Sequence, residues 1–328
     1  MIQKSHFGKR IAQHRKRLKR SQAELAEMLG VTSQAVSKWE CGTALPDVEL
    51  LLELSHLYGV SINALLEDTD ILKPLTDQEY RMDGAAVFDS GAELSPEWAA
   101  DIVEGKWIAR NWREANAKAR PVECDVGRRI AETGGLILEI GAEPGGGFAP
   151  YILRANPDAS IIISDMSPTV VREWKKYLDK ELDSPNLGYA AFDFCQLPFR
   201  DGCIDVVSDH GGIVNAVTAT GKIGNKGAAL REAYRVLKPD GLLVTTAGFV
   251  TKDTLAALPE QVQKVLLEKR PDIFEDLYEE TVLAGFRKID STVSGYWDTC
   301  DDESDIAELA CSLGVNLRFT NCVRFCRK

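Results

Sequence analysis

A short apolar run, Leu136–Ile140, leads directly into a segment in which four of seven residues, from Gly141 to Gly147, are glycine. Glycine tolerates positive φ and lets the backbone approach a ligand closely, and the start of a helix after such a turn attracts anionic groups. From this point the chain alternates apolar runs with helical patterns, which is typical of a mainly parallel sheet covered by helices on both faces. This segment therefore predicts an α/β fold with a doubly wound, Rossmann-like sheet.

The apolar runs predict seven strands, the last two hairpin-like, at residues 136–140, 160–164, 188–192, 204–208, 242–246, 287–293 and 315–325. Helical patterns fall at 147–155, 168–182, 225–237, 252–269 and 272–284. Ser95 followed by Pro96 is a helix-start signal, because proline at the first helical position loses only an N–H that would have no partner. We assign residues 95–328 to this domain, with a helical cap ahead of the sheet.

A separate helical pattern occupies the first 67 residues, and 328 residues exceed the usual size of one core. Periodicity begins at Phe7 and restarts after Ser21, whose hydroxyl has capping-box spacing with Glu24. Gly30 suits a left-handed turn before a third helix that ends at Trp39. Three short helices with a glycine in the tight turn are the arrangement that reads DNA.

Two more helices are expected at 48–58 and 62–66, which makes residues 1–67 an all-α domain of five helices. Residues 68–94 are acidic, contain proline and glycine and have little apolar periodicity, so they are assigned to a linker. No apolar run has membrane-spanning length and no leader is recognisable at the N-terminus, so we expect a cytoplasmic protein with no membrane partner.

The net charge of −11 would disfavour nucleic acid if it were evenly spread, because binding phosphate needs local Lys and Arg. Residues 1–20 hold eight basic residues and no acid, whereas residues 21–70 hold only Lys38 against nine acids. The N-terminal stretch can therefore face double-stranded DNA although the whole chain is acidic. The alternative for the basic run taken alone is a solvated helix face.

The N-terminal residues resemble the XRE family, the helix-turn-helix proteins of phage repressors and Cro. The resemblance rests on Phe7-Gly, Ser21-Gln-Ala-Glu-Leu-Ala, Gly30-Val-Thr-Ser-Gln-Ala-Val-Ser-Lys-Trp-Glu, Gly42, Pro46 and Gly59-Val-Ser. In that family the third helix enters the major groove, and dimers bind half-sites about one helical turn apart. The resemblance implies an operator, a homodimer, and DNA contacts from Gln22, Ser33, Gln34, Ser37 and Lys38.

Gln34 is the best base reader among these residues, because its amide can pair bidentately with adenine. Gln22 would contact phosphate at a helix start. The alternative is that Gln34 and Lys38 are merely solvated and that the domain serves dimerisation or protein binding.

In the second domain, Asp165 ends the second strand about 20 residues past the glycine turn, where an acid accepts hydrogen bonds from ribose hydroxyls. Asp193 follows the third strand. Both carboxylates have an alternative as helix caps. Because ligands of such sheets lie beyond the carboxyl ends of the strands, the loop and these acids predict one shared site.

This half resembles the class I S-adenosylmethionine-dependent methyltransferases, especially the small-molecule type. The matching segments are Leu197-Pro-Phe-Arg-Asp-Gly-Cys-Ile-Asp-Val-Val207 and Arg235-Val-Leu-Lys-Pro-Asp-Gly241, and the resemblance covers about Glu132 to Lys328. It implies S-adenosylmethionine as cofactor and S-adenosylhomocysteine as its product. The implied cofactor residues are Glu139, Gly141, Glu143 and Gly145 beside the methionine part, Asp165 at the ribose, Met166 on the adenine, and Asp193 with Phe194 at the adenine edge.

Glu143 departs from the family pattern, which has Gly-x-Gly-x-Gly where this chain has Gly141-Ala-Glu143-Pro-Gly145. Glutamate adds bulk and a charge close to the cofactor's carboxylate, at a position where glycine permits unusual φ. Our hypothesis is that binding is weakened, redirected toward another nucleoside ligand, or lost.

Methyl transfer needs mainly alignment, and a base only if the acceptor must lose a proton. Asp209 and His210 follow the fourth strand, where catalytic groups of the family lie, and neutral His210 is the candidate base. A structural hydrogen-bonding role for His210 is the alternative. The segment 211–227, rich in Gly, Thr and Asn, is expected to be a mobile loop over the acceptor.

The Ser208-Asp-His-Gly-Gly segment lacks the Asn or Asp-Pro-Pro-aromatic sequence of amino-methylating DNA enzymes, and the chain has no Pro-Cys nucleophile pair. DNA is therefore not expected to be the methyl acceptor. The eight cysteines fit no common zinc spacing, so no metal is expected and most of the cysteines should be buried thiols. The disfavoured alternative is a thiolate site formed by Cys300, Cys311, Cys322 and Cys326.

Two functions remain open from the sequence. The first is a DNA-binding regulator fused to a methyltransferase that acts on a small molecule. The second is a non-catalytic regulator that uses the methyltransferase fold to sense an effector or to dimerise. Glu143 favours the second, whereas Asp165, Asp193 and His210 favour the first.

Overall fold

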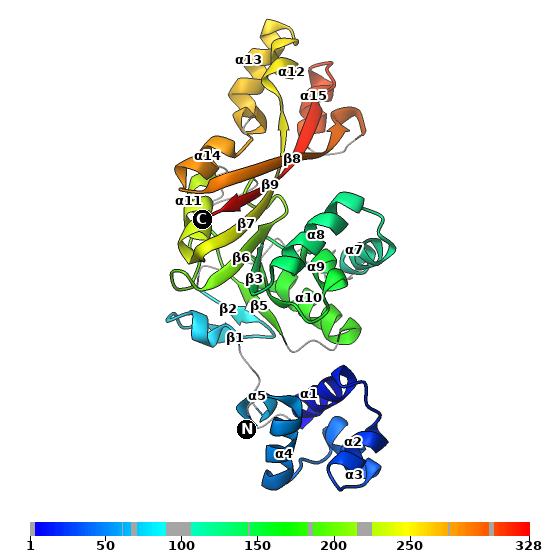
Figure 1. Cartoon of the computed structure of the whole chain (residues 1–328). Coiled ribbons are helices and arrows are strands. Elements are labelled where there is room, and N and C mark those ends of the chain that lie inside the picture. Colours follow the sequence, from blue (N-terminus) through cyan, green and yellow to red (C-terminus); the bar gives the residue numbers. More distant parts are fainter. Residues whose placement is uncertain are drawn as a thin grey trace. The chain divides into compact units, whose positions relative to one another are not determined.

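The fold is described from a computed structural model, which describes residues 4–60, 62–66, 71–89, 106–143, 145–182, 186–214, 225–274, 276–301 and 305–328. The chain divides into two compact units, residues 1–71 with 179–185 and residues 72–178 with 186–328. Figure 1 shows both units coloured along the sequence. Each has its own hydrophobic core.

The N-terminal unit contains five helices, as expected: α1 (Lys4–Arg17), α2 (Gln22–Met28), α3 (Ser33–Glu40), α4 (Val48–Tyr58) and α5 (Ile62–Leu66). The Ser21 hydroxyl accepts the Glu24 amide, and the Glu24 carboxylate accepts the Ser21 amide, so the predicted capping box is present. Gly30, at φ 62°, follows the C-cap residue Leu29 of α2. The core contains Phe7, Leu25 and Trp39, all buried.

The second unit is built on a nine-stranded sheet with the order β1-β2-β5-β4-β3-β6-β7-β9-β8. The strands are β1 (Arg81–Met82), β2 (Ala86–Val87), β3 (Leu136–Ile140), β4 (Ser160–Asp165), β5 (Leu187–Ala191), β6 (Ile204–Asp209), β7 (Leu237–Val250), β8 (Arg287–Asp298) and β9 (Arg318–Arg327). Strands β2, β5, β4, β3, β6 and β7 run parallel, and β9 and β8 are antiparallel additions. The mainly parallel α/β sheet and all seven predicted strands are confirmed.

Helices cover both faces of this sheet. Figure 1 shows α8 (Pro121–Thr133), α9 (Ala149–Ala155) and α10 (Pro168–Glu181) together on one side, and α11 (Lys226–Val236) with α14 (Tyr278–Leu283) on the other. Trp174 of α10 is fully buried, as are Ala229 and Leu230 of α11. Helix α7 (Lys106–Ala117) packs near α9. The predicted helix start at Ser95 and Pro96 lies outside the described residues.

Part of the segment predicted as a linker belongs to the sheet. Residues 73–75 form a 3-10 turn, and β1 and β2 form a small antiparallel pair in which β2 continues the sheet beside β5. The Arg200 guanidinium donates to both Asp77 carboxylate oxygens, at 2.8 and 2.5 Å, which ties this segment to the second unit. Strands of two residues are too short to show an alternating apolar pattern in the sequence. The pairing of β2 with the edge of β5 is therefore visible only in the structure.

Strand β7 continues well past the carboxyl ends of its parallel neighbours and, with β8 and β9, holds a second hydrophobic cluster. Helices α12 (Lys252–Ala256), α13 (Glu260–Lys269) and α15 (Asp305–Ser312) surround this cluster at one end of the unit (Figure 1). Pro259 separates α12 from α13, where the sequence predicted one helix. Within the described ranges, no helix is both long enough and apolar enough to cross a bilayer.

Candidate functional site

Helix α3 carries the side chains expected to read DNA. Its start is capped by Thr32, whose hydroxyl accepts the Ala35 amide at 3.2 Å. Ser33, Gln34 and Lys38 are exposed and Ser37 is half-buried, whereas Val36 and Trp39 on the other side of the helix are in the core. The helix therefore presents polar side chains on one face and is held by the core through the other.

Gln22, and Arg15 of the basic run, form hydrogen bonds within the domain. The Arg15 guanidinium donates to both carboxylate oxygens of Glu40, at 2.6 and 2.9 Å, and the Gln22 amide donates to Glu40 at 2.7 Å. Side chains of Arg15 and Glu40 are only 12% and 7% exposed. This network joins α1, α2 and α3, so the Gln22 side chain helps to hold the three helices together. Its role as a phosphate contact remains a prediction.

In the second unit, the glycine loop leaves β3 at the carboxyl edge of the sheet. Gly141 has φ 61°, and a Cβ there would come within 3.2 Å of the Gly212 backbone in the loop after β6. Gly147 has φ 55°, and the Glu139 carboxylate occupies the space that a Cβ would need. These two positions require glycine, the first by close backbone approach and the second by side-chain packing.

Glu143 has φ 49°, the left-handed conformation that favours glycine. Its backbone amide donates to Asp165 Oδ2 at 2.9 Å, and its carbonyl accepts the Trp174 indole N–H at 2.8 Å. The loop thus keeps the backbone course of a glycine loop with a glutamate at its centre. Pro144 lies outside the described residues.

Asp165 ends β4 under this loop and is 9% exposed. Besides the Glu143 amide, its carboxylate accepts the Ser167 amide at 2.9 Å. Amides from two separate segments therefore hold the carboxylate at the edge of the sheet. The predicted ribose-binding residue lies next to the glycine loop, as the strand order of a doubly wound sheet requires.

Glu139 is fully buried beneath the loop. Oε1 accepts the Phe148 amide at 2.8 Å at the start of α9, and Oε2 accepts the Ser208 hydroxyl of β6. The Ser164 hydroxyl of β4 donates to the Glu139 carbonyl at 2.6 Å. Through these bonds Glu139 joins three neighbouring strands and the helix that follows the loop, so in this structure it acts as a positioning residue.

Asp209 is also fully buried, at the end of β6. Oδ1 accepts the Ile213 amide at 3.0 Å, and Oδ2 accepts the Thr245 hydroxyl of β7 at 2.6 Å. The carboxylate thereby shapes the turn that contains His210 and Gly212. The His210 ring lies edge-on to Phe148 with 5.0 Å between ring centres, so the candidate base stands beside the start of α9.

Four carboxyl groups meet at this edge, and burial disfavours their charged forms. Burial raises the pKa of Glu139 to about 8 and that of Asp209 to about 6, and it also raises the pKa of Asp165. Although Glu143 is exposed, desolvation by nearby protein atoms raises its pKa to about 7, with added repulsion from Asp165 and Asp209.

Burial lowers the pKa of His210, so the imidazole is neutral at physiological pH and able to accept a proton. A neutral imidazole beside this group of carboxyls fits acid–base chemistry, and it fits equally well a structural ring packed on Phe148.

The remaining predicted cofactor residues lie at the same edge. Asp193 is 9% exposed and its carboxylate accepts the Cys195 amide at 2.8 Å within a turn, so it does not cap a helix, and its contact with the adenine edge stays a prediction. Phe194 is buried, with a ring carbon 4.0 Å from the position of a Gly141 Cβ. Met166 is half-buried directly after Asp165.

Sequence reasoning missed the side chains that support these residues: Ser208, Thr245 and Trp174. Ser208 and Thr245 are one strand away from their carboxylate partners, and Trp174 lies in α10, so no local spacing identifies them. The only signal was position: the two hydroxyls stand near the carboxyl ends of the buried strands β6 and β7, where an apolar residue would be expected.

The cysteines form no recognisable centre. Cys322 and Cys326 are buried in β9, whereas Cys300 and Cys311 are exposed. No cluster of three or more potential metal ligands occurs in the part of the chain that the structure describes.

Comparison with known proteins assigns a family to each half. The helix-turn-helix family matches residues 11–65, and a methyltransferase domain matches residues 138–245. Over 82 residues the chain is 38% identical to the SPbeta prophage-derived uncharacterized HTH-type transcriptional regulator YonR of Bacillus subtilis, with 24% of this chain and 76% of that protein covered. The chain belongs to the XRE-type helix-turn-helix family. A methyltransferase domain is fused to this helix-turn-helix domain.

The second half is 28% identical over 124 residues to the ubiquinone/menaquinone biosynthesis C-methyltransferase UbiE of Hydrogenovibrio crunogenus. This alignment covers 38% of the chain and 46% of the enzyme, so the chain spans about half of that relative's length. Among solved structures, it is similar to Haemonchus contortus phosphoethanolamine N-methyltransferase 2 in complex with S-adenosyl-L-methionine, with 18% identity, a TM-score of 0.42, and 60% of this chain and 49% of that chain covered.

Proposed function

We propose that this protein is a transcription regulator that binds a double-stranded DNA operator through α3. The observation that carries this proposal is the exposure of Ser33, Gln34 and Lys38 on one face of a helix whose other face is held by Val36 and Trp39. Direct readout needs side chains that reach base edges from a rigidly held helix. A homodimer on paired half-sites is the matching assembly.

We further propose that the second domain binds S-adenosylmethionine and methylates a small molecule, with S-adenosylhomocysteine as product. Asp165 would hold the ribose, and the loop from Gly141 to Gly147 would lie along the methionine part. The backbone fits this cofactor because Glu143 already adopts the φ that glycine would supply. A pKa of about 7 leaves Glu143 partly protonated near neutral pH, which reduces its repulsion of the cofactor's carboxylate.

Bound S-adenosylmethionine supplies a methyl group on a sulfonium sulfur, and the protein's part is to align the acceptor with it. His210, neutral because of its burial, would take a proton from an acceptor that has one to lose. Asp209 is proposed as a positioning residue, since its carboxylate is fully buried and holds the turn around His210.

The second candidate is a non-catalytic regulator whose methyltransferase fold senses an effector. One observation favours it: Asp165, the residue proposed for the ribose, already accepts the amide of Glu143, and the Glu143 side chain stands close enough to Asp165 for their charges to interact. Such a loop would favour a ligand other than S-adenosylmethionine.

Calorimetric titration of the full chain with S-adenosylmethionine and S-adenosylhomocysteine distinguishes the methyltransferase from the non-catalytic regulator. Glu143→Gln removes the charge but keeps the Cβ, and Glu143→Gly removes both, so the pair separates electrostatic from conformational effects. Micromolar binding by the native chain, abolished by Asp165→Asn, supports the methyltransferase. Binding only by the Glu143 variants supports the non-catalytic regulator, and binding by none of these proteins contradicts the cofactor proposal.

A further inference from the structure

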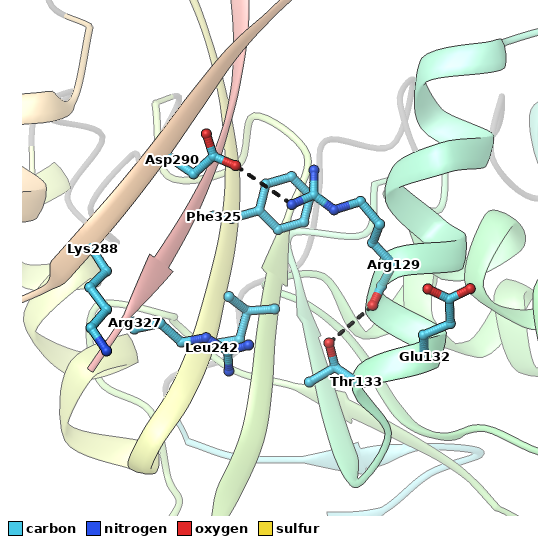
Figure 2. A pocket seen from close by; sticks show the side chains of 8 residues that line it. All are labelled: Arg129, Glu132, Thr133, Leu242, Lys288, Asp290, Phe325 and Arg327. Atoms are coloured by element: carbon cyan, nitrogen blue, oxygen red, sulfur yellow. Dashed lines mark hydrogen bonds and ion pairs between the residues drawn. The ribbon is translucent and has the colours of Figure 1, made fainter.

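A charged groove lies at the amino ends of the parallel strands, opposite the edge that carries the glycine loop. It encloses about 420 Å³ between the end of α8 and the strands β7, β8 and β9. Figure 2 shows Arg129 and Thr133 on the helix side, and Lys288 and Arg327 on the strand side, with Leu242 between them. The groove therefore has cationic groups on both walls and an apolar floor.

Arg129 is held in place by an aromatic ring. Its guanidinium carbon lies 3.5 Å from the centre of the Phe325 ring, which is buried in β9. Asp290 forms an ion pair with Arg129, but the carboxylate is 3.7 Å from Nη2, longer than a hydrogen bond (Figure 2). Among the described residues, Asp290 gives the only ion pair of Arg129, so a fixed fork of N–H groups remains for an anion.

On the opposite wall, β8 and β9 hold cationic side chains close together, which is electrostatically unfavourable. Arg287 of β8 stands directly across from Arg327 of β9, and like charges in cross-strand pairs are destabilising. The pairing of β8 and β9 shifts register between Arg287 and Asp290, and Lys288 within this shift has φ 49°, an unfavourable conformation for lysine. Strain and repulsion at one place indicate a function that offsets them.

The acids of the groove do not neutralise it. Glu132 receives the Arg128 guanidinium at 2.7 Å, on the exposed side of α8. Asp290 is shared loosely with Arg129, as described above. Arg327 donates one N–H to the Asp240 carbonyl at 3.0 Å, which positions its guanidinium without cancelling the charge.

We propose that this groove binds a small polyanion that carries phosphate or carboxylate groups. Arg129 would supply a planar fork, and Lys288 and Arg327 would supply an ammonium group and a second guanidinium from the other wall. The site lies at the opposite edge of the sheet from Asp165 and His210, so it is independent of the proposed methyl-donor site. It is a place at which an effector can act on a regulator.

The test is calorimetric titration of the full chain, at low ionic strength, with inorganic pyrophosphate and, separately, with citrate. The native chain is expected to bind at least one of them, and the stronger of the two identifies the phosphate or the carboxylate class. Lys288→Glu should weaken that binding about tenfold or more. Lys264→Glu, the same charge change on the exposed face of α13, should leave it unchanged and controls for net charge.

Lys288→Gly separates binding from folding. Glycine relieves the positive φ, so this variant should melt at the same or a higher temperature than the native chain while it binds the anion more weakly. No binding of either anion by the native chain at millimolar concentration would overturn the proposal, as would equal binding by native protein and Lys288→Glu. If Lys288→Glu weakens binding of a random-sequence DNA duplex but pyrophosphate and citrate do not bind, the groove contacts DNA backbone and the proposal is also overturned.

Discussion

At the scale of single residues, the carboxyl group of Glu139 illustrates how the cofactor loop is supported. It is fully buried, joins the start of α9 to Ser208 of β6, and fills the space beside Gly147. Burial raises its pKa to about 8, well above the ordinary value of a glutamate. At neutral pH the folded protein therefore holds a proton there that the unfolded chain has already lost.

This proton makes stability depend on pH. The folded pKa exceeds the unfolded value, so the stabilisation is complete below the unfolded pKa and is lost as pH rises toward 8, by up to about 1.4 kcal/mol per pH unit. In Glu139→Gln, which keeps the amide and hydroxyl partners, the fall in the free energy of unfolding between pH 6 and 8 should be smaller. Urea unfolding at several pH values measures this pH dependence of the free energy of unfolding, and Glu268→Gln, at an exposed position, is the control. An unchanged slope would show that Glu139 is ionised in the folded protein.

Glu143 carries conformational strain as well as charge. Replacing it with glycine should stabilise the second unit by about 1 kcal/mol, because the left-handed φ no longer opposes a side chain. Asp240→Gly is a matched control, since Asp240 has φ 60° away from the loop. Chemical denaturation of both variants measures the effect; a gain confined to Asp240→Gly would mean that the Glu143 side chain makes a compensating contact.

At the scale of elements, α3 depends on its neighbours for its orientation. The Glu40 carboxylate receives Arg15 from α1 and Gln22 from α2, and Gly8 of α1 lets that helix approach the Trp39 carbonyl so closely that a Cβ would clash. The sequence predicted the helices from capping and periodicity. It did not predict this network, because Arg15, Gln22 and Glu40 are far apart in the chain and look like ordinary surface residues.

Gln34 provides the test of α3 as a recognition helix. Gln34→Ala should weaken operator binding by about 1–3 kcal/mol and relax discrimination at one base position, because a bidentate contact to adenine would be lost. The melting temperature should not change, since the side chain is exposed. Selection of a preferred duplex from a random pool, followed by titration, measures the affinity and the base discrimination. Gln78→Ala, at an exposed position, is the control. Identical affinity of native protein and Gln34→Ala would favour a dimerisation or protein-binding domain.

At the scale of the whole molecule, two units with separate cores should unfold separately. S-adenosylhomocysteine, which is proposed to bind only the second unit, should raise one calorimetric transition, and a random-sequence duplex at low salt should raise the other. Saturation at about 100 times Kd contributes about 2.7 kcal/mol to the unit that binds. A single transition shifted by both ligands would mean that the units unfold as one.

Local patterns were enough to predict the five N-terminal helices, the seven main strands, the glycine loop and the acid at the end of β4. Periodicity, caps and glycine spacing act over a few residues, so a linear reading finds them. The local patterns did not predict that residues 81–82 and 86–87 join the sheet, that Glu139 and Asp209 support the site from within, or that Arg129, Lys288 and Arg327 face one groove. Pairing across strands, burial and the pKa shifts that follow from burial depend on residues distant in the chain, and they arise only when the fold brings those residues together.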